Sequence, residues 1–189
     1  MVLECKVPVT CKIRILPDDR DTLKLCKAIE EAGASIICVH GRLKEQKKTL
    51  TGECEWEIIR LIKQQAKIPI FANGGIYTFE DVQRCLEYTG ADGVMSSEAL
   101  LENPALFSRE IPDLDEIALE YLEICKGFDH KEERKMIKPH LFKFLHAGLR
   151  SHPDLRSLIG SARTIEEQIL AVELLKEKRK GLSKEDKFG

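Results

Sequence analysis

The stretch PIFANGGIYTFED, residues 69–81, has the pattern of a buried strand that stops at Asn73-Gly74-Gly75 and continues as a helix. Adjacent glycines let the backbone turn through positive φ angles and let a ligand approach the main chain closely. The free amide groups at the start of the following helix suit a phosphate. A tight strand-to-helix turn without a ligand accounts for the same residues, so this stretch alone leaves both interpretations open.

The strand-then-helix pattern occurs four times in the first half of the chain. The apolar runs that we interpret as strands are at 9–15, 35–40, 69–73 and 93–97. The helical patterns that follow them are at about 20–32, 54–66 and 78–88, with a short one around Ala99 and Leu100. Continuous apolar strands that alternate with amphipathic helices are typical of a parallel sheet covered by helices. We therefore predict an α/β fold for residues 8–108.

From Pro112 onward the strand pattern disappears. Helical patterns run at about 113–126, 131–150 and 161–180, with breaks at Gly127, Pro153 and Gly160. We predict two domains, an α/β part over 1–111 and a helical part over 112–189, whose charged C-terminal tail should fray. The four strands suit either a small open sheet or half of an eight-stranded barrel, whose unpaired edges would favour association with another chain.

The composition excludes several classes of protein. The 189-residue chain has 30 basic and 32 acidic residues, which excludes a globally basic nucleic-acid binder but permits a local basic face. It contains neither an apolar run near the roughly 20 residues of a membrane span nor a secretory signal. Its seven cysteines form no C-x-x-C pair, which is typical of reduced thiols and argues against a zinc site. We expect a cytoplasmic or nuclear protein without membrane contact or bound metal.

Polar residues follow each predicted strand, and in a parallel sheet these ends lie at one face. They are Lys12 and Arg14, His40-Gly41-Arg42, Asn73-Gly74-Gly75, and Ser96-Ser97-Glu98. A lysine inside an apolar strand needs a partner, which an anionic ligand or an electron-rich ring would supply; an edge strand would leave Lys12 in solvent. A lone His40 is more often structural, but with Lys12 and the glycines it favours a binding site. The last two strands of a barrel commonly bind a phosphate.

The stretch HKEERKMIKPHLFKFLHAGLRSHPDLR, residues 130–156, is rich in basic residues. A basic helical face of this kind would contact the phosphates of RNA or DNA. The candidate contacts are Lys131, Arg134, Lys138, Lys143 and Arg150. Glu132 and Glu133 favour the alternative, a solvated helix surface.

Five motifs follow one another along the chain: VTCKIRI, VHGRL, LTGECEW, IPIFANGGI and TGADGVMSSEALLENPALF. Taken in order, they resemble the carboxyl-terminal part of the tRNA-dihydrouridine synthases, and most of all the eukaryotic type that acts on positions 16 and 17. The resemblance covers about Pro8 to Val172. ANGGI and GADGVM recur in many phosphate-binding barrels. The ordered set followed by a helical domain is more specific.

The resemblance implies the C-terminal half of a flavin-binding (β/α)8 TIM barrel, followed by a small all-α domain that grips tRNA. It implies FMN as cofactor, NADPH as reductant, and reduction of uridine to dihydrouridine in tRNA. The residues implied to contact FMN are Lys12, His40, Asn73, Gly74, Gly75, Ser97 and Glu98, and Arg42 would lie near the flavin or the RNA.

The chain departs from the family pattern in two places. Ser97-Glu98 stand where bacterial relatives have Gly-Arg, so only main-chain phosphate contacts carry over there. The general-acid cysteine of the family lies in the first barrel half, so we expect no catalytic residue in this chain. We expect a fragment, a truncated isoform or an incomplete gene model that binds FMN weakly or not at all and is inactive alone. A homodimer or the missing half would cover its sheet edges.

Two other functions fit the same residues. The chain could belong to another phosphate- or FMN-binding barrel enzyme, although the basic helical part argues against this. It could also be a noncatalytic RNA-binding module in which the sheet is only a scaffold.

Overall fold

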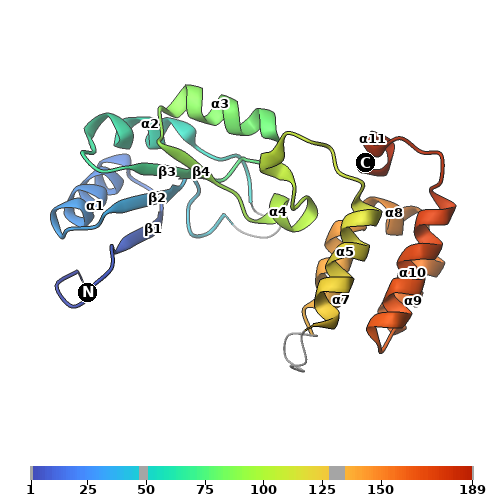
Figure 1. Cartoon of the computed structure of the whole chain (residues 1–189). Helices are drawn as coiled ribbons and strands as arrows, with labels where there is room; N and C mark the ends of the chain where they lie inside the picture. The colour runs from blue at the N-terminus through green and yellow to red at the C-terminus, as the bar shows by residue number, and fades with distance from the viewer. Residues whose placement is uncertain (1, 47–50, 128–134, 189) are drawn as a thin grey trace. The chain divides into compact units, whose positions relative to one another are not determined.

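The computed structural model describes residues 2–46, 51–127 and 135–188 (Figure 1). The chain forms two compact units, Met1–Ser97 and Glu98–Gly189. The border lies earlier than the predicted one after residue 111 because helix α4 (Glu98–Glu102) packs against α7 (Ile137–Phe144). No helix within the described ranges is long and apolar enough to cross a membrane.

The first unit is built on a four-stranded parallel sheet with the order β1-β2-β3-β4, which confirms the predicted α/β class. The strands are β1 (Thr10–Arg14), β2 (Ile36–His40), β3 (Ile70–Asn73) and β4 (Gly93–Met95). Each strand neighbours the next one along the chain, as in a (β/α)8 barrel. A doubly wound sheet would instead reverse its strand order at a switch point.

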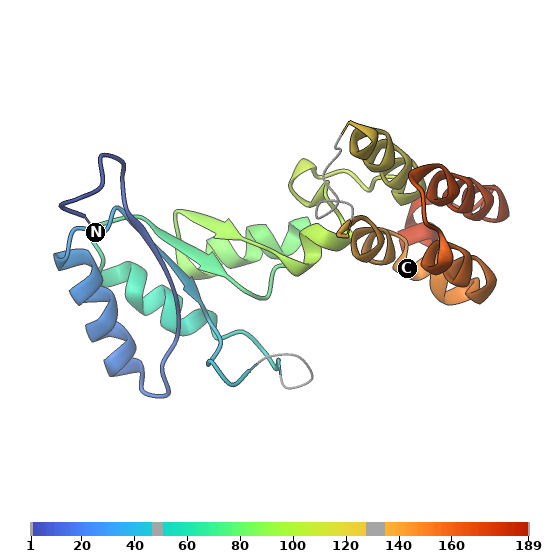
Figure 2. The same cartoon turned by 90° about the horizontal axis from the view of Figure 1, so that it is seen from below.

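Three helices follow the first three strands, as the apolar periodicity predicts. They are α1 (Asp19–Glu31), α2 (Trp56–Gln65) and α3 (Phe79–Thr89). Helix α2 packs against both α1 and α3, so the three form one layer beside the sheet (Figures 1 and 2). Fully buried side chains from β2, β3 and α2, including Ile37, Ile70 and Ile59, form the core of this unit.

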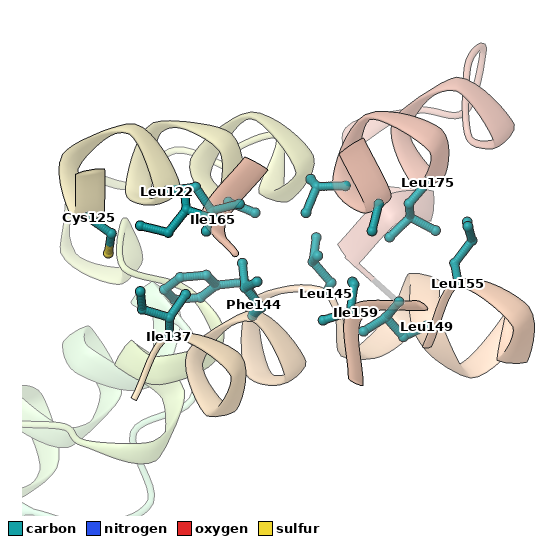
Figure 3. Packing of buried hydrophobic residues seen from close by; sticks show 14 residues of the cluster. Leu122, Cys125, Ile137, Phe144, Leu145, Leu149, Leu155, Ile159, Ile165 and Leu175 are labelled. Carbon is teal, nitrogen blue, oxygen red and sulfur yellow. The ribbon is translucent and has the colours of Figure 1, made fainter. Parts of the chain in front are cut away.

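The second unit contains only helices among its described residues. After α4 come the 3-10 turn Leu106–Ser108 and the helices α5 (Leu114–Lys126), α7 (Ile137–Phe144), α8 (His146–Ser151), α9 (Pro153–Ser161), α10 (Ile165–Lys178) and α11 (Lys184–Phe188). Figure 3 shows their shared core, in which Leu122 of α5, Phe144 of α7 and Leu175 of α10 are buried.

Two details of the helical part differ from the predicted pattern. The described part of the expected helix over 131–150 is two helices, α7 and α8, that meet at Leu145. The break predicted at Gly160 is wrong, because Gly160 lies inside α9. The break predicted at Pro153 is present between α8 and α9, and Pro153 begins α9, a position that suits proline because the first turn needs no amide donor from it.

The predicted fraying of the C-terminal tail is wrong. Arg179 and Lys187 are 3% and 7% exposed. Arg179 forms an ion pair of 2.7 Å with Asp115, and Lys187 pairs with Asp113 at 2.7 Å and Asp115 at 3.2 Å. The run of charges suggests a solvated tail because its acidic partners stand far away in the sequence, at the start of α5.

Candidate functional site

The register of the sheet aligns the predicted strand-end residues in one row. Arg14 pairs in register with His40, His40 with Asn73, and Asn73 with Met95. Residues at equivalent positions of parallel strands lie at the same edge of the sheet. The carboxyl ends of all four strands therefore meet, as the sequence predicts.

Asn73 connects the strands at this edge. The Lys12 ammonium donates to Asn73 Oδ1 at 2.7 Å, and Asn73 Nδ2 donates to the Met95 carbonyl at 2.8 Å. Asn73 is 5% exposed, whereas Lys12 keeps an exposed side chain. Lys12 thus has a neutral partner in the protein and keeps its positive charge at the edge.

Arg42 is buried beside His40, with an exposure of 7%. Its Nε donates to the Gly52 carbonyl at 3.1 Å, its Nη2 donates to the Tyr77 hydroxyl at 3.3 Å, and its Nη1 lies 3.4 Å from His40 Nε2. Arg42 thus lies next to His40 at the carboxyl edge of the sheet, with its guanidinium held by neighbouring groups.

His40 remains neutral under ordinary conditions. Burial lowers its pKa first, and the positive charges of Arg14, Lys12 and Arg42 lower it further, to about 4. A neutral imidazole carries one donor and one acceptor nitrogen. His40 can therefore orient a ligand by hydrogen bonding without adding a positive charge.

The sheet edge carries positive charges that pair with no carboxylate in the described part of the chain. Arg14 donates to the carbonyls of Leu43 and Gln46 at 2.7 and 3.1 Å. Among the residues that the structure describes, Lys12, Arg14 and Arg42 donate only to neutral groups. Three cations with neutral partners attract an anion.

Gly74 and Gly75 are required by the local packing as well as by their backbone conformation, with φ angles of 98° and 75°. A Cβ on Gly74 would lie 2.8 Å from both Cys54 Sγ and His40 Cδ2, and one on Gly75 would lie 3.2 Å from Trp56 Nε1. Trp56 Nε1 also donates to the Gly74 carbonyl at 3.0 Å. The sequence reasoning missed Cys54 and Trp56 as parts of this site, although both lie in the motif LTGECEW.

The Asp81 carboxylate takes up two amides of the turn that leads into α3. The Asp81 carboxylate accepts hydrogen bonds of 2.9 Å from the amides of both Tyr77 and Thr78. Thr78 in turn caps the helix by accepting from the Asp81 amide, as the Thr-x-x-Asp spacing indicates. The amides of Tyr77 and Thr78 are therefore already paired and are not free to bind a phosphate at this loop.

Ser97 and Glu98, predicted to act together, fall in different units. Ser97 is exposed at the end of the first unit, and Glu98 begins α4 in the second. Within the second unit, Lys143 pairs with Glu98 at 3.1 Å and with Glu102 at 3.3 Å. The hydrogen bond to Glu98 raises the pKa of the Lys143 ammonium. Glu98, predicted to contact the cofactor, and Lys143, predicted to contact RNA, therefore form an ion pair with each other.

The remaining RNA-contact candidates have different surroundings. Lys138 donates to the Gly160 carbonyl at 2.9 Å. Arg150 is exposed, and none of the described residues pairs with it. Lys131 and Arg134 lie outside the described residues.

The family model described as dihydrouridine synthase (Dus) matches residues 1–185. The chain belongs to the dihydrouridine synthase family.

Its curated relatives in this family are longer proteins. A tRNA-dihydrouridine(16/17) synthase NAD(P)(+)-like protein of Mus musculus is 42% identical over 160 residues, which are 85% of this chain and 33% of the relative. The tRNA-dihydrouridine(16/17) synthase NAD(P)(+) of Schizosaccharomyces pombe is 41% identical over 173 residues, covering 85% of this chain and 43% of the relative. This chain of the dihydrouridine synthase family thus spans less than half the length of these relatives.

A solved dihydropteroate synthase from Xanthomonas albilineans aligns with 92% of this chain and 85% of its own. The TM-score is 0.40 and the sequence identity is 14%, values too low to bear on the fold or function of this family member.

Proposed function

We propose that this chain is the part of a tRNA-dihydrouridine synthase that binds FMN at the carboxyl edge of its sheet and tRNA through its helical unit. The sheet would be the C-terminal half of a (β/α)8 barrel, and the helical unit a separate all-α domain. The strongest support comes from the three cations Lys12, Arg14 and Arg42, which lie at the edge with the positive-φ glycines and whose partners among the described residues are all neutral. The relatives named for positions 16 and 17 of tRNA suggest the reaction.

The residues of the edge fit the chemical groups of FMN. The amides around Gly74 and Gly75 suit its phosphate, with Ser97 and Glu98 adding main-chain contacts only. Lys12 would stabilise negative charge on a reduced ring, and neutral His40 would orient the ring by a hydrogen bond. When bound, FMN would supply the hydride chemistry that reduces uridine to dihydrouridine, with NADPH as the reductant.

The helical unit would hold the RNA while the target uridine leaves its stack. Arg150 is the best placed of the described candidates, because it is exposed and has no described partner. Lys138 would contact a phosphate beside its bond to the Gly160 carbonyl. Lys143 would have to exchange Glu98 and Glu102 for a phosphate, so we assign it a smaller share of the binding. The proposed set of RNA contacts also includes Lys131 and Arg134. We propose that the protein acts in the cytoplasm or nucleus, where tRNA is modified.

An FMN titration of the full 189-residue chain, followed by flavin fluorescence, tests the cofactor site. We expect weak, saturable binding that Lys12→Ala reduces about tenfold, the effect of losing one charge-assisted contact. Lys24→Ala is the control, because Lys24 is exposed on α1 and pairs with Asp21. Absence of saturable binding, or equal binding by both variants, would contradict the proposed FMN site.

Binding of unmodified tRNA to the same chain separates the alternatives. The proposal expects tRNA binding that weakens with salt and in Arg150→Ala. FMN binding without tRNA binding would favour another flavin- or phosphate-binding barrel enzyme. Binding of tRNA without FMN would favour a noncatalytic RNA-binding module.

A further inference from the structure

The two edges of the His40 ring have different surroundings. A Cβ on Gly74 would lie 2.8 Å from Cδ2 and 2.9 Å from Nε2 of His40, so this edge of the ring packs against the glycine backbone. Nε2 also lies 3.4 Å from Arg42 Nη1. Among the described residues, no group pairs with Nδ1, and the His40 side chain is only half-buried.

The Arg42 guanidinium is compatible with only one protonation state of His40 Nε2, the unprotonated one. A guanidinium has donors only, so the ring nitrogen opposite Nη1 must present its lone pair. Bonds from Arg42 to the Gly52 carbonyl and the Tyr77 hydroxyl hold the guanidinium in place. A protonated Nε2 would set two N–H groups against each other inside a buried site, which is unfavourable.

We propose that Arg42 is a positioning residue that holds His40 in its neutral Nδ1–H tautomer, so that His40 donates one hydrogen bond, through Nδ1, to an acceptor on the bound ligand. The nature of that ligand rests on the proposed function: a heteroaromatic ring with a carbonyl oxygen or an unprotonated ring nitrogen. A ligand that presents an N–H or O–H at this position would be disfavoured, because two donors would meet.

The charges around the ring support this role. The charged groups that face His40 are Lys12 and Arg14 from β1 and Arg42 from the loop after β2, and all are cations. The Cys54 thiol, which shares the Gly74 contact, has its pKa raised by burial and stays neutral. With the His40 pKa lowered to about 4, the ring carries a single proton at neutral pH, and Arg42 decides which nitrogen bears it.

Nitrogen-15 NMR of the uniformly labelled full chain tests the tautomer directly. Long-range proton–nitrogen correlations distinguish protonated from unprotonated ring nitrogens, and the His40 signals are those lost in His40→Gln. We expect protonated Nδ1 and unprotonated Nε2 at pH 7. In Arg42→Met we expect a mixture of tautomers and a His40 pKa that moves part of the way back to 6.5, since burial, the first cause of the lowering, remains. Arg150→Met, on α8, is the control and should change neither.

A protonated Nε2 in the unsubstituted chain would overturn the inference, and this result needs no variant. An unchanged tautomer in a folded Arg42→Met chain would also overturn it. Adding FMN should shift the Nδ1–H signal. If FMN leaves that signal unchanged while Nδ1 is protonated, the proposed FMN site fails and the role of Arg42 stands.

Discussion

Asn73 holds Lys12 at the carboxyl edge of the sheet without cancelling its positive charge. Its side-chain amide accepts from Lys12 and donates to the Met95 carbonyl, and its own carbonyl accepts from the Gly41 amide at 3.2 Å. An uncharged amide supplies an acceptor oxygen and a donor nitrogen at the same side-chain terminus. An aspartate would pair with Lys12, cancel its charge and leave the Met95 carbonyl without this donor. The neutral asparagine therefore orders the lysine and leaves its charge for a ligand.

Gly74→Ala is expected to destabilise the first unit by about 2 kcal/mol, because it combines a left-handed backbone with a close contact. The added Cβ would lie 2.8 Å from Cys54 Sγ at a φ of 98°. Urea unfolding followed by Trp56 fluorescence measures this. Gly160→Ala in the other unit is the control, since its Cβ would meet nothing nearer than 3.8 Å and the unfolding followed by Trp56 should stay unchanged. Equal stability of the two variants would contradict this account of Gly74.

The lowered pKa of His40 makes the stability of the first unit depend on pH. In the unfolded chain the imidazole takes up a proton near pH 6.5, whereas in the folded chain it does so only near pH 4. Between these values the unfolded state binds more protons, so stability should fall as the pH drops from 6.5 to 4. Urea unfolding at pH 7 and pH 5 checks this. The difference should shrink in His40→Gln, and an unchanged difference would remove His40 as its cause.

At the scale of elements, buried ion pairs connect the C-terminal helix α11 to the start of α5. Burial lowers the pKa of Lys187, but its hydrogen bonds to Asp113 and Asp115 outweigh that effect and raise it overall. The Lys187 side chain is 8% exposed and that of Asp115 is 0% exposed. Removing one partner of a buried pair leaves an uncompensated charge, which costs far more than losing a surface pair.

Lys187→Met should therefore destabilise the helical unit by about 3 kcal/mol. Lys180→Met is the matched control: Lys180 is exposed and pairs with Glu177 of the preceding turn at 3.3 Å, so the loss should stay below about 1 kcal/mol. Thermal unfolding followed by far-ultraviolet circular dichroism compares the two. Similar melting temperatures would mean that the tail does not support the unit.

At the scale of the whole molecule, the sheet has two edges. Strands β1 and β4 each have a single neighbour within the described sheet. Unpaired edges of a parallel sheet favour association with another chain. We expect the purified chain to form dimers or larger species as its concentration rises, measured by sedimentation velocity. A monomer across the full concentration range would show that these edges are protected in another way.

Local patterns in the sequence determined the parallel sheet, its helices, the capping box at Thr78 and the family, because each depends on residues close together in the chain. They also placed Lys12, His40 and Asn73 at one edge, since parallel strands end on the same side. The actual partners depended on the tertiary structure. Lys12 meets Asn73 across 61 positions and Arg179 meets Asp115 across 64. No periodicity reveals such pairs, so only the fold decided that Arg42 is buried against His40, that Lys143 binds Glu98, and that Arg179 and Lys187 of the charged tail are buried.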